Sequence, residues 1–276
     1  MGAARRCWQA AAAAIVAATL LTSPATAQEQ RTDQCANKGR VLGADIVIRA
    51  CTAVIEAGPP GPRVAWALGN RANAWGSKGE TDRAIADYDE ATRLAPTYAL
   101  AYEGLGAMWR VKGDKDNAIA NYNEAIWIDH KFGYAYAARG ETYYEWGDFA
   151  EAAEDLQRGN ELIDEAYAMI WLFLARGRLG QDGASELATH AAKLKTKDWP
   201  FAVIDALLGH RTVAQMQAAA ANPDQTCEAA FYGGEWQLLR GNSSEARAAL
   251  QRAFDTCPKN FIEYSGARGE LRRQPP

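Results

Sequence analysis

Ser77-Lys-Gly-Glu-Thr-Asp-Arg-Ala-Ile-Ala-Asp-Tyr-Asp-Glu-Ala91 is followed 34 residues later by Val111-Lys-Gly-Asp-Lys-Asp-Asn-Ala-Ile-Ala-Asn-Tyr-Asn-Glu-Ala125, which matches it in almost every column. A third, more divergent copy runs from Glu145 to Gly159. A repeat of this period is typical of helical hairpins, because each hairpin can bury its apolar face only against its neighbours. The sequence therefore predicts an all-α fold, a right-handed α-solenoid of stacked hairpins, and no strand pattern interrupts it.

Large and small side chains alternate through the columns of the repeat. In register, the columns are Leu68, Tyr102 and Tyr136; Ala72, Gly106 and Gly140; Trp75, Trp109 and Tyr143; Gly79, Gly113 and Gly147; Ala84, Ala118 and Ala152; and Tyr88, Tyr122 and Leu156. The small columns allow two antiparallel helices to approach closely, the aromatic columns fill the space between them, and the glycine at the turn closes each hairpin. This arrangement resembles the tetratricopeptide repeat family.

The repeat pattern divides the chain into five segments. They are a leader peptide (residues 1–27), an N-terminal segment with one helix (28–64), three regular units (65–166), irregular helical repeats (167–226), and a final unit with a capping helix (227–276). The single N-terminal helix is expected over Asp45–Ala57. Asn222-Pro-Asp224 is expected to break the chain before the final unit, whose first helix would begin at Cys227. Phe261–Arg272 is expected to be an amphipathic helix that covers the apolar face of this unit.

The first 27 residues have the pattern of a secretory signal. Arg5 and Arg6 precede an apolar run of twelve residues, Ala10–Leu21, and Ala25-Thr-Ala27 supplies small residues for cleavage. The run is shorter than the roughly 20 residues needed to span a bilayer. We therefore expect a cleaved signal and a periplasmic mature chain without a transmembrane segment. The alternative is an uncleaved anchor.

Composition excludes several classes of protein. Of the 276 residues, 48% are hydrophobic and 23% are charged, which is ordinary for a globular chain and excludes a disordered, collagen-like or disulfide-built polypeptide. The formal net charge is −4, and it becomes more negative when the leader removes its two arginines. A mildly acidic chain without basic runs is a poor candidate for binding nucleic acid.

The cysteines suggest two disulfides. Cys7 leaves with the leader, and the remaining even number in an exported chain favours pairing. Cys227 and Cys257 open and close the final hairpin, so they should lie side by side, and a bond between them would staple the hairpin. Cys35 and Cys51 are then left to pair and would tie the N-terminal segment to its helix. The alternative is free buried thiols.

No constellation of catalytic or metal-binding residues is recognisable in the sequence. His130, His190 and His210 are widely separated and form no metal-ligand pattern, so no metal or other cofactor is expected. The nucleophile elbow, the phosphate-binding loop and the dinucleotide fingerprint are missing. Acidic pairs such as Asp87 and Asp89 are expected on the outer faces of second helices, where carboxylates are solvated. We therefore expect that the chain is not an enzyme.

The concave surface of the solenoid is the candidate functional site, because the first helices of stacked hairpins line an inner groove. The residues expected to contact a partner there are Trp66, Asn70 and Asn73 in the first regular unit, Leu100, Glu103 and Arg110 in the second, and Tyr134, Glu141 and Tyr144 in the third. This stripe mixes aromatic with hydrogen-bonding and charged groups, a composition suited to an extended or helical peptide. The alternative is that several of these aromatics pack between neighbouring units.

A closer resemblance involves the C-terminal end. Phe231-Tyr-Gly-Gly-Glu-Trp-Gln-Leu-Leu-Arg-Gly241 and Asn260-Phe-Ile-Glu-Tyr-Ser-Gly-Ala-Arg-Gly-Glu-Leu271 are similar to the end of the NlpI family of bacterial envelope lipoproteins, and Trp171-Leu-Phe-Leu-Ala175 is similar to its middle. That resemblance implies a homodimeric adaptor that docks a periplasmic protease and peptidoglycan-cleaving enzymes. Cys35 follows Thr32-Asp-Gln34 instead of a leucine and small residues, so no lipid anchor is expected.

Two functions are compatible with these patterns. The first is a non-enzymatic periplasmic adaptor that binds proteins or peptides in its groove, among them envelope hydrolases or a protease. The alternative is an envelope protein that binds glycan or peptidoglycan fragments, because aromatic side chains also stack on sugar rings. A homodimer is implied by the NlpI resemblance alone.

Overall fold

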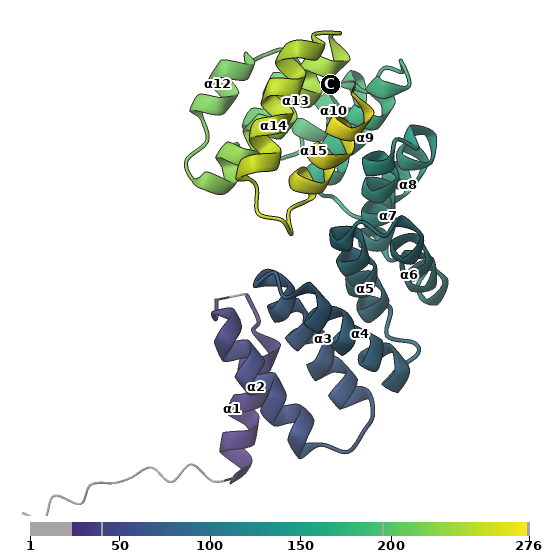
Figure 1. The fold of residues 1–276 in the computed structure, drawn as a ribbon, viewed down its shortest axis with the longest axis vertical. Helices are drawn as coiled ribbons and strands as arrows, with labels where there is room; N and C mark the ends of the chain where they lie inside the picture. Colours follow the sequence, from purple (N-terminus) through teal and green to yellow (C-terminus); the bar gives the residue numbers. More distant parts are fainter. Residues whose placement is uncertain (1–23, 40, 195, 275–276) are drawn as a thin grey trace, which may run out of the picture.

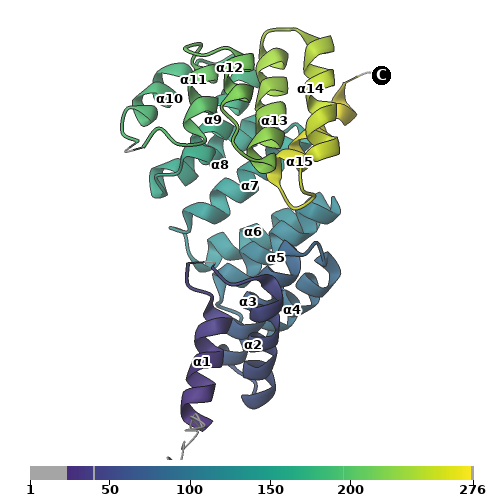
Figure 2. The same ribbon diagram turned by 90° about the vertical axis from the view of Figure 1, so that its left-hand side faces the viewer.

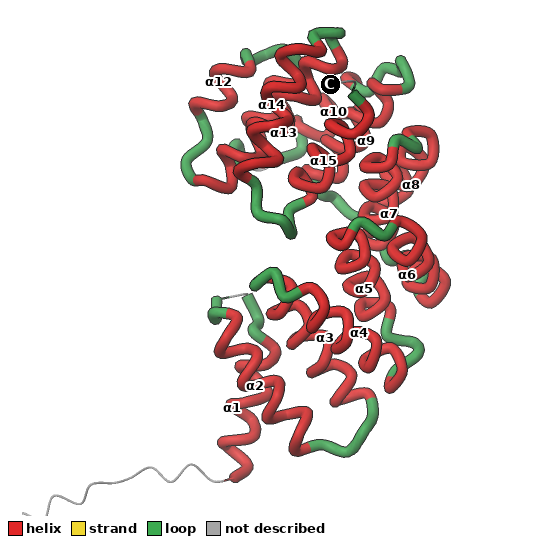
Figure 3. Tube along the Cα trace, viewed as in Figure 1, coloured by secondary structure: helices red, strands yellow, loops and turns green. Residues whose placement is uncertain are grey.

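The computed structural model describes residues 24–39, 41–194 and 196–274, which form helices and no strand (Figure 3). The helices up to residue 162 are α1 (Pro24–Ala36), α2 (Ala44–Ala57), α3 (Pro62–Ser77), α4 (Thr81–Leu94), α5 (Ala99–Lys112), α6 (Lys115–Ile128), α7 (Gly133–Trp146) and α8 (Phe149–Leu162). The later helices are α9 (Ala166–Arg178), α10 (Ala184–Ala191), α11 (Phe201–Leu207), α12 (Val213–Ala218), α13 (Pro223–Leu239), α14 (Ser243–Thr256) and α15 (Ile262–Arg273). None of the described helices is both long enough and apolar enough to cross a bilayer.

The helices stack as antiparallel hairpins into a curved α-solenoid, as the repeat predicts. The three regular units are α3 with α4, α5 with α6, and α7 with α8. Figure 1 shows a C-shaped path in which an N-terminal arm, α1 to α4, and a C-terminal lobe, α9 to α15, face each other across an open side. The first helix of each regular unit lies nearer the open side than the second. We call the surface of α3, α5 and α7 on that side the inner wall.

Small residues set the spacing within each hairpin. A Cβ atom on Gly106 would lie 2.8 Å from the Tyr122 ring, and one on Gly140 would lie 2.8 Å from Leu156. Both distances are shorter than van der Waals contact, so glycine is needed at positions 106 and 140. Tyr122 and Leu156 are fully buried. The alternation of small and large columns therefore positions the helices that carry the inner wall.

The N-terminal segment contains two helices where the sequence predicts one. α1 packs on α2 and α3, and a disulfide joins Cys35 near the end of α1 to Cys51 in α2, with Cα atoms 4.7 Å apart. The repeat pattern does not reveal α1, because this helix is dominated by polar residues and has no apolar stripe. α1 begins at Pro24 and so includes the last residues of the predicted leader. The rest of that leader, residues 1–23, lies outside the described residues.

The C-terminal lobe surrounds one large apolar core. Trp171 is fully buried in it, and its ring centroid lies 5.1 Å from that of Tyr144 and 5.2 Å from that of Phe231. The final hairpin, α13 with α14, begins earlier than predicted, because the side chain of Asn222 caps α13 and Pro223 is its first residue. Proline is tolerated in the first turn of a helix, so the Asn-Pro pair starts this helix instead of breaking the chain.

A second disulfide closes the final hairpin. Cys227 in α13 is bonded to Cys257 at the end of α14, with Cα atoms 5.0 Å apart. The two bonded pairs are those that the sequence favours. One covalent link therefore ties the first two helices of the chain, and the other ties the last hairpin.

The last helix does more than cap the final unit. α15 packs on α14 and α13, and it also packs on α7 in the middle of the solenoid (Figures 1 and 2). Its Arg268 lies 123 residues along the chain from its ion-pair partner Glu145 in α7. α7 and α13 are the first helices of their hairpins, so α15 lies on the inner side of the solenoid.

Candidate partner-binding surface

The inner wall is hollowed near the N-terminal end. A hollow of about 560 Å³ lies between the α1–α2 loop, α2 and the C-terminal half of α3, and we call it the N-terminal hollow. Its lining contains no charged residue. It combines small and apolar side chains, such as Ala74 and Val47, with the amides of Asn37, Asn70 and Asn73. Two of the predicted groove residues, Asn70 and Asn73, therefore line an open neutral hollow.

Asn70 and Asn73 each use half of their side-chain amide inside the protein. Nδ2 of Asn70 donates to the carbonyl oxygen of Trp66 at 3.1 Å, and Oδ1 of Asn73 accepts from the hydroxyl of Tyr88 at 2.9 Å. Within the described chain, Oδ1 of Asn70 and Nδ2 of Asn73 have no such partner. An acceptor and a donor therefore remain one turn apart on α3, and they match the N–H and C=O groups of a peptide backbone.

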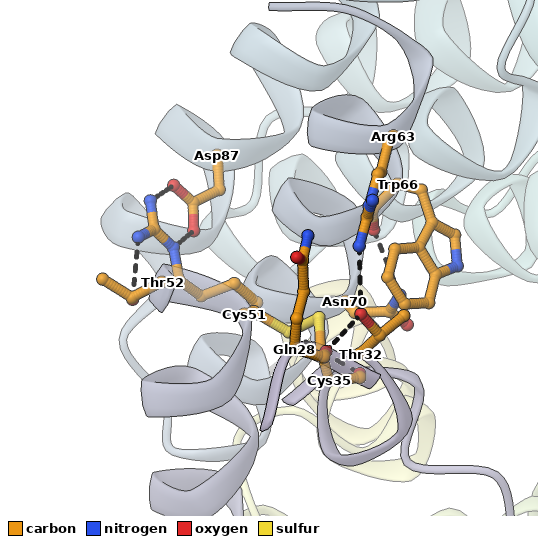
Figure 4. The surroundings of a disulfide bond; sticks show 10 residues. Gln28, Thr32, Cys35, Cys51, Thr52, Arg63, Trp66, Asn70 and Asp87 are labelled. Carbon is orange, nitrogen blue, oxygen red and sulfur yellow. Dashed lines mark hydrogen bonds and ion pairs between the residues drawn. A yellow bond between two sulfur atoms is a disulfide. The ribbon is translucent and has the colours of Figure 1, made fainter. Parts of the chain in front are cut away.

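Trp66 holds the N-terminal helices in place. It packs against the small core formed by α1, α2 and α3, and Figure 4 shows it close to the Cys35–Cys51 disulfide. Nη2 of Arg63 donates to Oγ1 of Thr32 at 3.2 Å and fixes α1 on this side of α3. Trp66 therefore packs between neighbouring helices, which is the alternative to contact with a partner.

A buried ion pair joins the two helices of the first unit. Nε and Nη2 of Arg71 donate to the two carboxylate oxygens of Asp87, each at 2.7 Å (Figure 4). The same geometry recurs in the third unit between Arg139 and Asp155. The expectation that Asp87 is a solvated outer-face residue is wrong, because it is 8% exposed and faces the first helix of its own hairpin.

The middle of the inner wall carries exposed apolar side chains. Leu100 near the start of α5 and Tyr134 near the start of α7 are each 56% exposed. Glu103 is half-buried one turn after Leu100. Sequence reasoning misses Trp127, which is 71% exposed near the end of α6. Its position in the sequence could indicate this exposure. Trp127 lies just before the turn into the next unit, where the second helix of one unit ends and the first helix of the next begins.

The C-terminal end of the inner wall is covered by α15. Arg268 donates to the carbonyl oxygen of Arg110 at 3.3 Å, at the end of α5, and to the carboxylate of Glu145 at 2.5 Å. Arg273 donates to the backbone carbonyl of Glu145 at the end of α7. Carbonyl groups at helix C-termini carry partial negative charge, so both guanidinium groups bind there favourably. Arg110 is 7% exposed, and this predicted groove residue is therefore not accessible to a partner.

The prediction that Tyr144 contacts a partner is wrong. Its side chain is fully buried, and its hydroxyl donates to Oε2 of Glu235 at 2.6 Å. Its ring centroid lies 5.0 Å from that of Phe149 and 5.1 Å from that of Trp171. The periodicity of α7 places Tyr144 near the inward stripe, but the helices of the C-terminal lobe pack over that position.

Buried carboxyl groups gather where α7, α13 and α15 meet. Desolvation, together with the charge of Glu270, raises the pKa of Glu235 to about 8. Desolvation, together with the charge of Glu228, raises the pKa of Glu263 to about 7. The pKa of Glu141, another predicted groove residue, is also raised to about 7, chiefly by desolvation. Glu235 and Glu263 are therefore part of the packed junction, whereas Glu141 is half-buried on α7.

Sequence reasoning also misses how α15 reaches α7. A Cβ atom on Gly269 would lie 2.2 Å from the backbone oxygen of Glu145, so the absence of a side chain lets the two helices touch. The sequence does contain a signal, a glycine directly after an arginine within a helical stretch. The helix that receives this contact is not encoded locally, so its identity requires the structure.

The inner wall presents groups suited to recognition. These are the amides of the N-terminal hollow and the exposed apolar side chains of α5 to α7. Among the residues that the structure describes, no three or more His, Cys, Asp or Glu side chains are grouped so as to hold a metal ion. His190 lies 3.3 Å from Asp164, and His210 lies 3.8 Å from Asp205, as separate pairs.

Comparison with known proteins confirms the repeat. The model of the tetratricopeptide repeat matches residues 67–98 and 133–164. The Lipoprotein NlpI homolog of Haemophilus influenzae is 29% identical over 121 residues, which are 41% of this chain. The chain spans 38% of the length of that curated relative. The chain therefore contains tetratricopeptide repeats, and part of it resembles NlpI.

Solved structures share the architecture. A tetratricopeptide repeat protein from Parabacteroides merdae has a TM-score of 0.56 at 14% identity, with 88% of this chain and 98% of that chain covered. The C-terminal part of a repeat-containing protein from Cytophaga hutchinsonii has a TM-score of 0.52 at 16% identity, with 87% and 98% covered. At these identities the likeness concerns the fold alone, and it agrees with the α-solenoid.

Proposed function

We propose that this chain with its tetratricopeptide repeats is a non-enzymatic adaptor that holds polypeptide partners against the N-terminal half of its inner wall. One observation carries the proposal. The N-terminal hollow is open and neutral, and it has free hydrogen-bonding groups, whereas α15 covers the C-terminal end of the same wall. A partner would therefore bind along α2, α3 and the start of α5.

The hollow suits an extended segment of polypeptide. Oδ1 of Asn70 would accept from a backbone N–H of the partner, and Nδ2 of Asn73 would donate to a backbone carbonyl. Both side chains are already oriented by hydrogen bonds inside the protein, so little entropy is lost when the partner binds. The exposed side chains of Leu100 and Tyr134 would add apolar contacts further along the wall.

We place the adaptor in the periplasm. The leader pattern, the disulfides and the partial likeness to an envelope lipoprotein homolog support this location. By analogy with the NlpI family, the partners would include peptidoglycan hydrolases or a periplasmic protease, and the chain would act as a homodimer.

Quantitative crosslinking in an envelope extract tests the groove. The double variant Asn70→Ala with Asn73→Ala should lose at least tenfold of the partners that the wild type captures. The matched control is Asn121→Ala on the second helix α6, which should retain them. If the double variant captures the same partners in the same amounts, the hollow does not bind them.

A second candidate function is glycan binding, and a different hollow favours it. Trp109 and Trp146 line a hollow of about 560 Å³ together with Lys115 and Asp116. Aromatic rings beside hydrogen-bonding side chains are the elements of a sugar-binding surface. Sedimentation with purified, protein-free sacculi tests this function, and Trp109→Ala should abolish co-sedimentation. Failure of the wild type to sediment would exclude it.

A further inference from the structure

A hollow at the far end of the C-terminal lobe lies outside the surfaces described so far. It has a volume of about 550 Å³ and is formed by the α11–α12 loop, α12, the end of α13 and the α13–α14 turn. Figures 1 and 2 show α12 beside α13 at the end of the molecule opposite α1. We call this space the distal hollow. It shares no lining residue with the N-terminal hollow, and the adaptor function does not account for it.

The charged lining of the distal hollow is entirely positive. His210 and Arg211 come from the α11–α12 loop, Arg240 follows the last residue of α13, and no Asp or Glu is part of the lining. The whole chain has a formal net charge of −4, so a lining with cations alone differs from the average surface of this protein. A lining of this kind attracts an anion.

The two arginines are not neutralised by strong internal pairs. Among the described residues Arg240 has no ion pair, and its guanidinium carbon lies 4.4 Å from the centroid of the Trp236 ring. This cation–π contact orients the guanidinium group and leaves its N–H groups free. Arg211 and His210 share the carboxylate of Asp205 at 3.7 and 3.8 Å, and both distances are longer than a hydrogen bond. The hollow therefore keeps an excess of positive charge.

The uncharged side chains of the lining offer donors, because their acceptors are already used inside the protein. Oε1 of Gln215 accepts from the backbone N–H of Thr212 at 2.9 Å, and Oγ1 of Thr212 accepts from the backbone N–H of Gln215 at 3.2 Å. Oε1 of Gln237 accepts from Nδ2 of Asn242 at 2.7 Å. Within the described chain, Nε2 of both glutamines has no acceptor. Apart from Oδ1 of Asn242, these side chains therefore offer an external ligand donors.

The arrangement of these groups favours a tetrahedral oxyanion over a planar one. The donors come from two sides, the α11–α12 loop with α12 on one side and the end of α13 on the other. A carboxylate has two oxygens in one plane, whereas a phosphate group has terminal oxygens that point in different directions. Guanidinium groups bind phosphate through pairs of parallel hydrogen bonds. The volume of the hollow also leaves room for the organic group that carries the phosphate.

We propose that the distal hollow binds a phosphate group, which belongs either to a soluble phosphate compound or to a lipid headgroup. The guanidinium groups of Arg211 and Arg240 would bind its oxygens, and Nε2 of Gln215 and of Gln237 would donate to them. The distal hollow belongs to the C-terminal lobe and the N-terminal hollow to the N-terminal arm, so phosphate binding does not depend on the adaptor function (Figure 1).

Equilibrium dialysis of the purified chain against radiolabelled orthophosphate and glycerol 3-phosphate tests the soluble source. Arg211→Gln with Arg240→Gln should weaken binding about tenfold. The matched control is Arg49→Gln with Arg252→Gln, which removes the same charge from two exposed arginines and should bind like the wild type. Acetate at the same ionic strength should not displace the phosphate. Co-sedimentation with vesicles of phosphatidylcholine, with or without phosphatidylglycerol, tests the lipid source with the same variants.

A chemical footprint on the wild-type protein locates the site without relying on the folding of a variant. Phenylglyoxal modifies accessible arginines, and bound phosphate should slow the modification of Arg240 but not that of Arg252, as measured by mass spectrometry. Binding of orthophosphate or glycerol 3-phosphate identifies a soluble ligand, and binding of the phosphatidylglycerol vesicles alone identifies a headgroup. Three results overturn the proposal: no probe binds the wild type, the control variant loses as much binding as the variant at the hollow, or acetate competes as well as phosphate.

Discussion

Gly269→Ala should destabilise the protein, although alanine normally favours a helix. At an exposed interior position of a helix, alanine is preferred over glycine by about 1 kcal/mol. At position 269 the new Cβ atom would lie 2.2 Å from the backbone oxygen of Glu145 and 3.1 Å from its carbonyl carbon. A clash with backbone cannot be relieved by rotation of a side chain. α15 must therefore move away from α7.

The magnitude follows from the contacts that α15 would lose. Overpacking of a close interface costs about 1 to 3 kcal/mol. Movement of α15 also weakens the 2.5 Å ion pair between Arg268 and Glu145, whose carboxylate side chain is only 2% exposed. Separation of a buried pair costs about 3 kcal/mol when it is complete. After the gain in helix propensity, we expect a net loss of about 2 kcal/mol, or about 4 to 8 °C in melting temperature for a chain of this size.

Thermal unfolding followed by circular dichroism measures this change, and hydrogen exchange reports on α15 directly. The variant should lose amide protection in α15 before the rest of the molecule. Gly43→Ala is the matched control, because nothing lies within 4 Å of its Cβ position and its φ of −64° suits alanine. The control should melt within about 2 °C of the wild type. A Gly269→Ala protein that melts at or above the wild-type temperature, with normal protection of α15, would refute the close approach of the two helices.

The buried carboxyls, the second disulfide and the repeated ion pair give three more predictions. The folded-state pKa values of Glu235 (about 8) and Glu263 (about 7) lie above the ordinary value of 4.5, so their stabilising contribution is complete below about pH 4.5 and is lost as the pH rises through 7 to 8. The melting temperature should therefore fall between pH 5 and pH 8.5, and the fall should be smaller in Glu263→Gln; an equal slope in both proteins would contradict the assignment. Cys227→Ser should lower the free energy of unfolding in urea by about 3 to 4 kcal/mol relative to the oxidised wild type, and full reduction of the wild type should lower it further, because reduction also breaks the Cys35–Cys51 disulfide. Arg139→Ala leaves the carboxylate of Asp155 buried without its partner and should cost about 3 kcal/mol in the same assay, whereas the double variant with Asp155→Ala should recover part of the loss.

The repeated hairpins are predictable because their determinants are local. Gly106 faces Tyr122 and Gly140 faces Leu156 within one hairpin, and both pairs are separated by 16 residues in the sequence. A pattern that is satisfied inside each unit appears as a fixed period. The existence of these helices and their order therefore follow from sequence alone.

The remaining features depend on contacts between distant segments. α1 has no apolar stripe and is held by the Cys35–Cys51 disulfide, so hydrophobic periodicity does not mark it. Tyr144 has the spacing of an inner-wall residue, but α9 and α13 bury it. The periodicity of α7 does not predict which helices from later in the chain pack on it.

In the candidate site, too, residues set by local contacts are predictable and residues set by distant contacts are not. Asn70 and Asn73 line the N-terminal hollow because that part of the wall is built from neighbouring segments, and their contact with a partner stays a prediction. Arg110 is covered because α15 returns to the end of α5. The extent of open wall therefore depends on the last helix, and sequence periodicity does not report it.

The return of α15 sets an order of events during synthesis on the ribosome. In a simple array of repeats, each unit can fold as soon as its neighbour has emerged. Here the carboxylate of Glu145 pairs with Arg268, so the packing of the third unit is complete only after the final residues have been translated. A polypeptide truncated by a premature stop before α15 would expose buried acids of its midsection, and it would present quality-control proteases with a flaw far from the missing end.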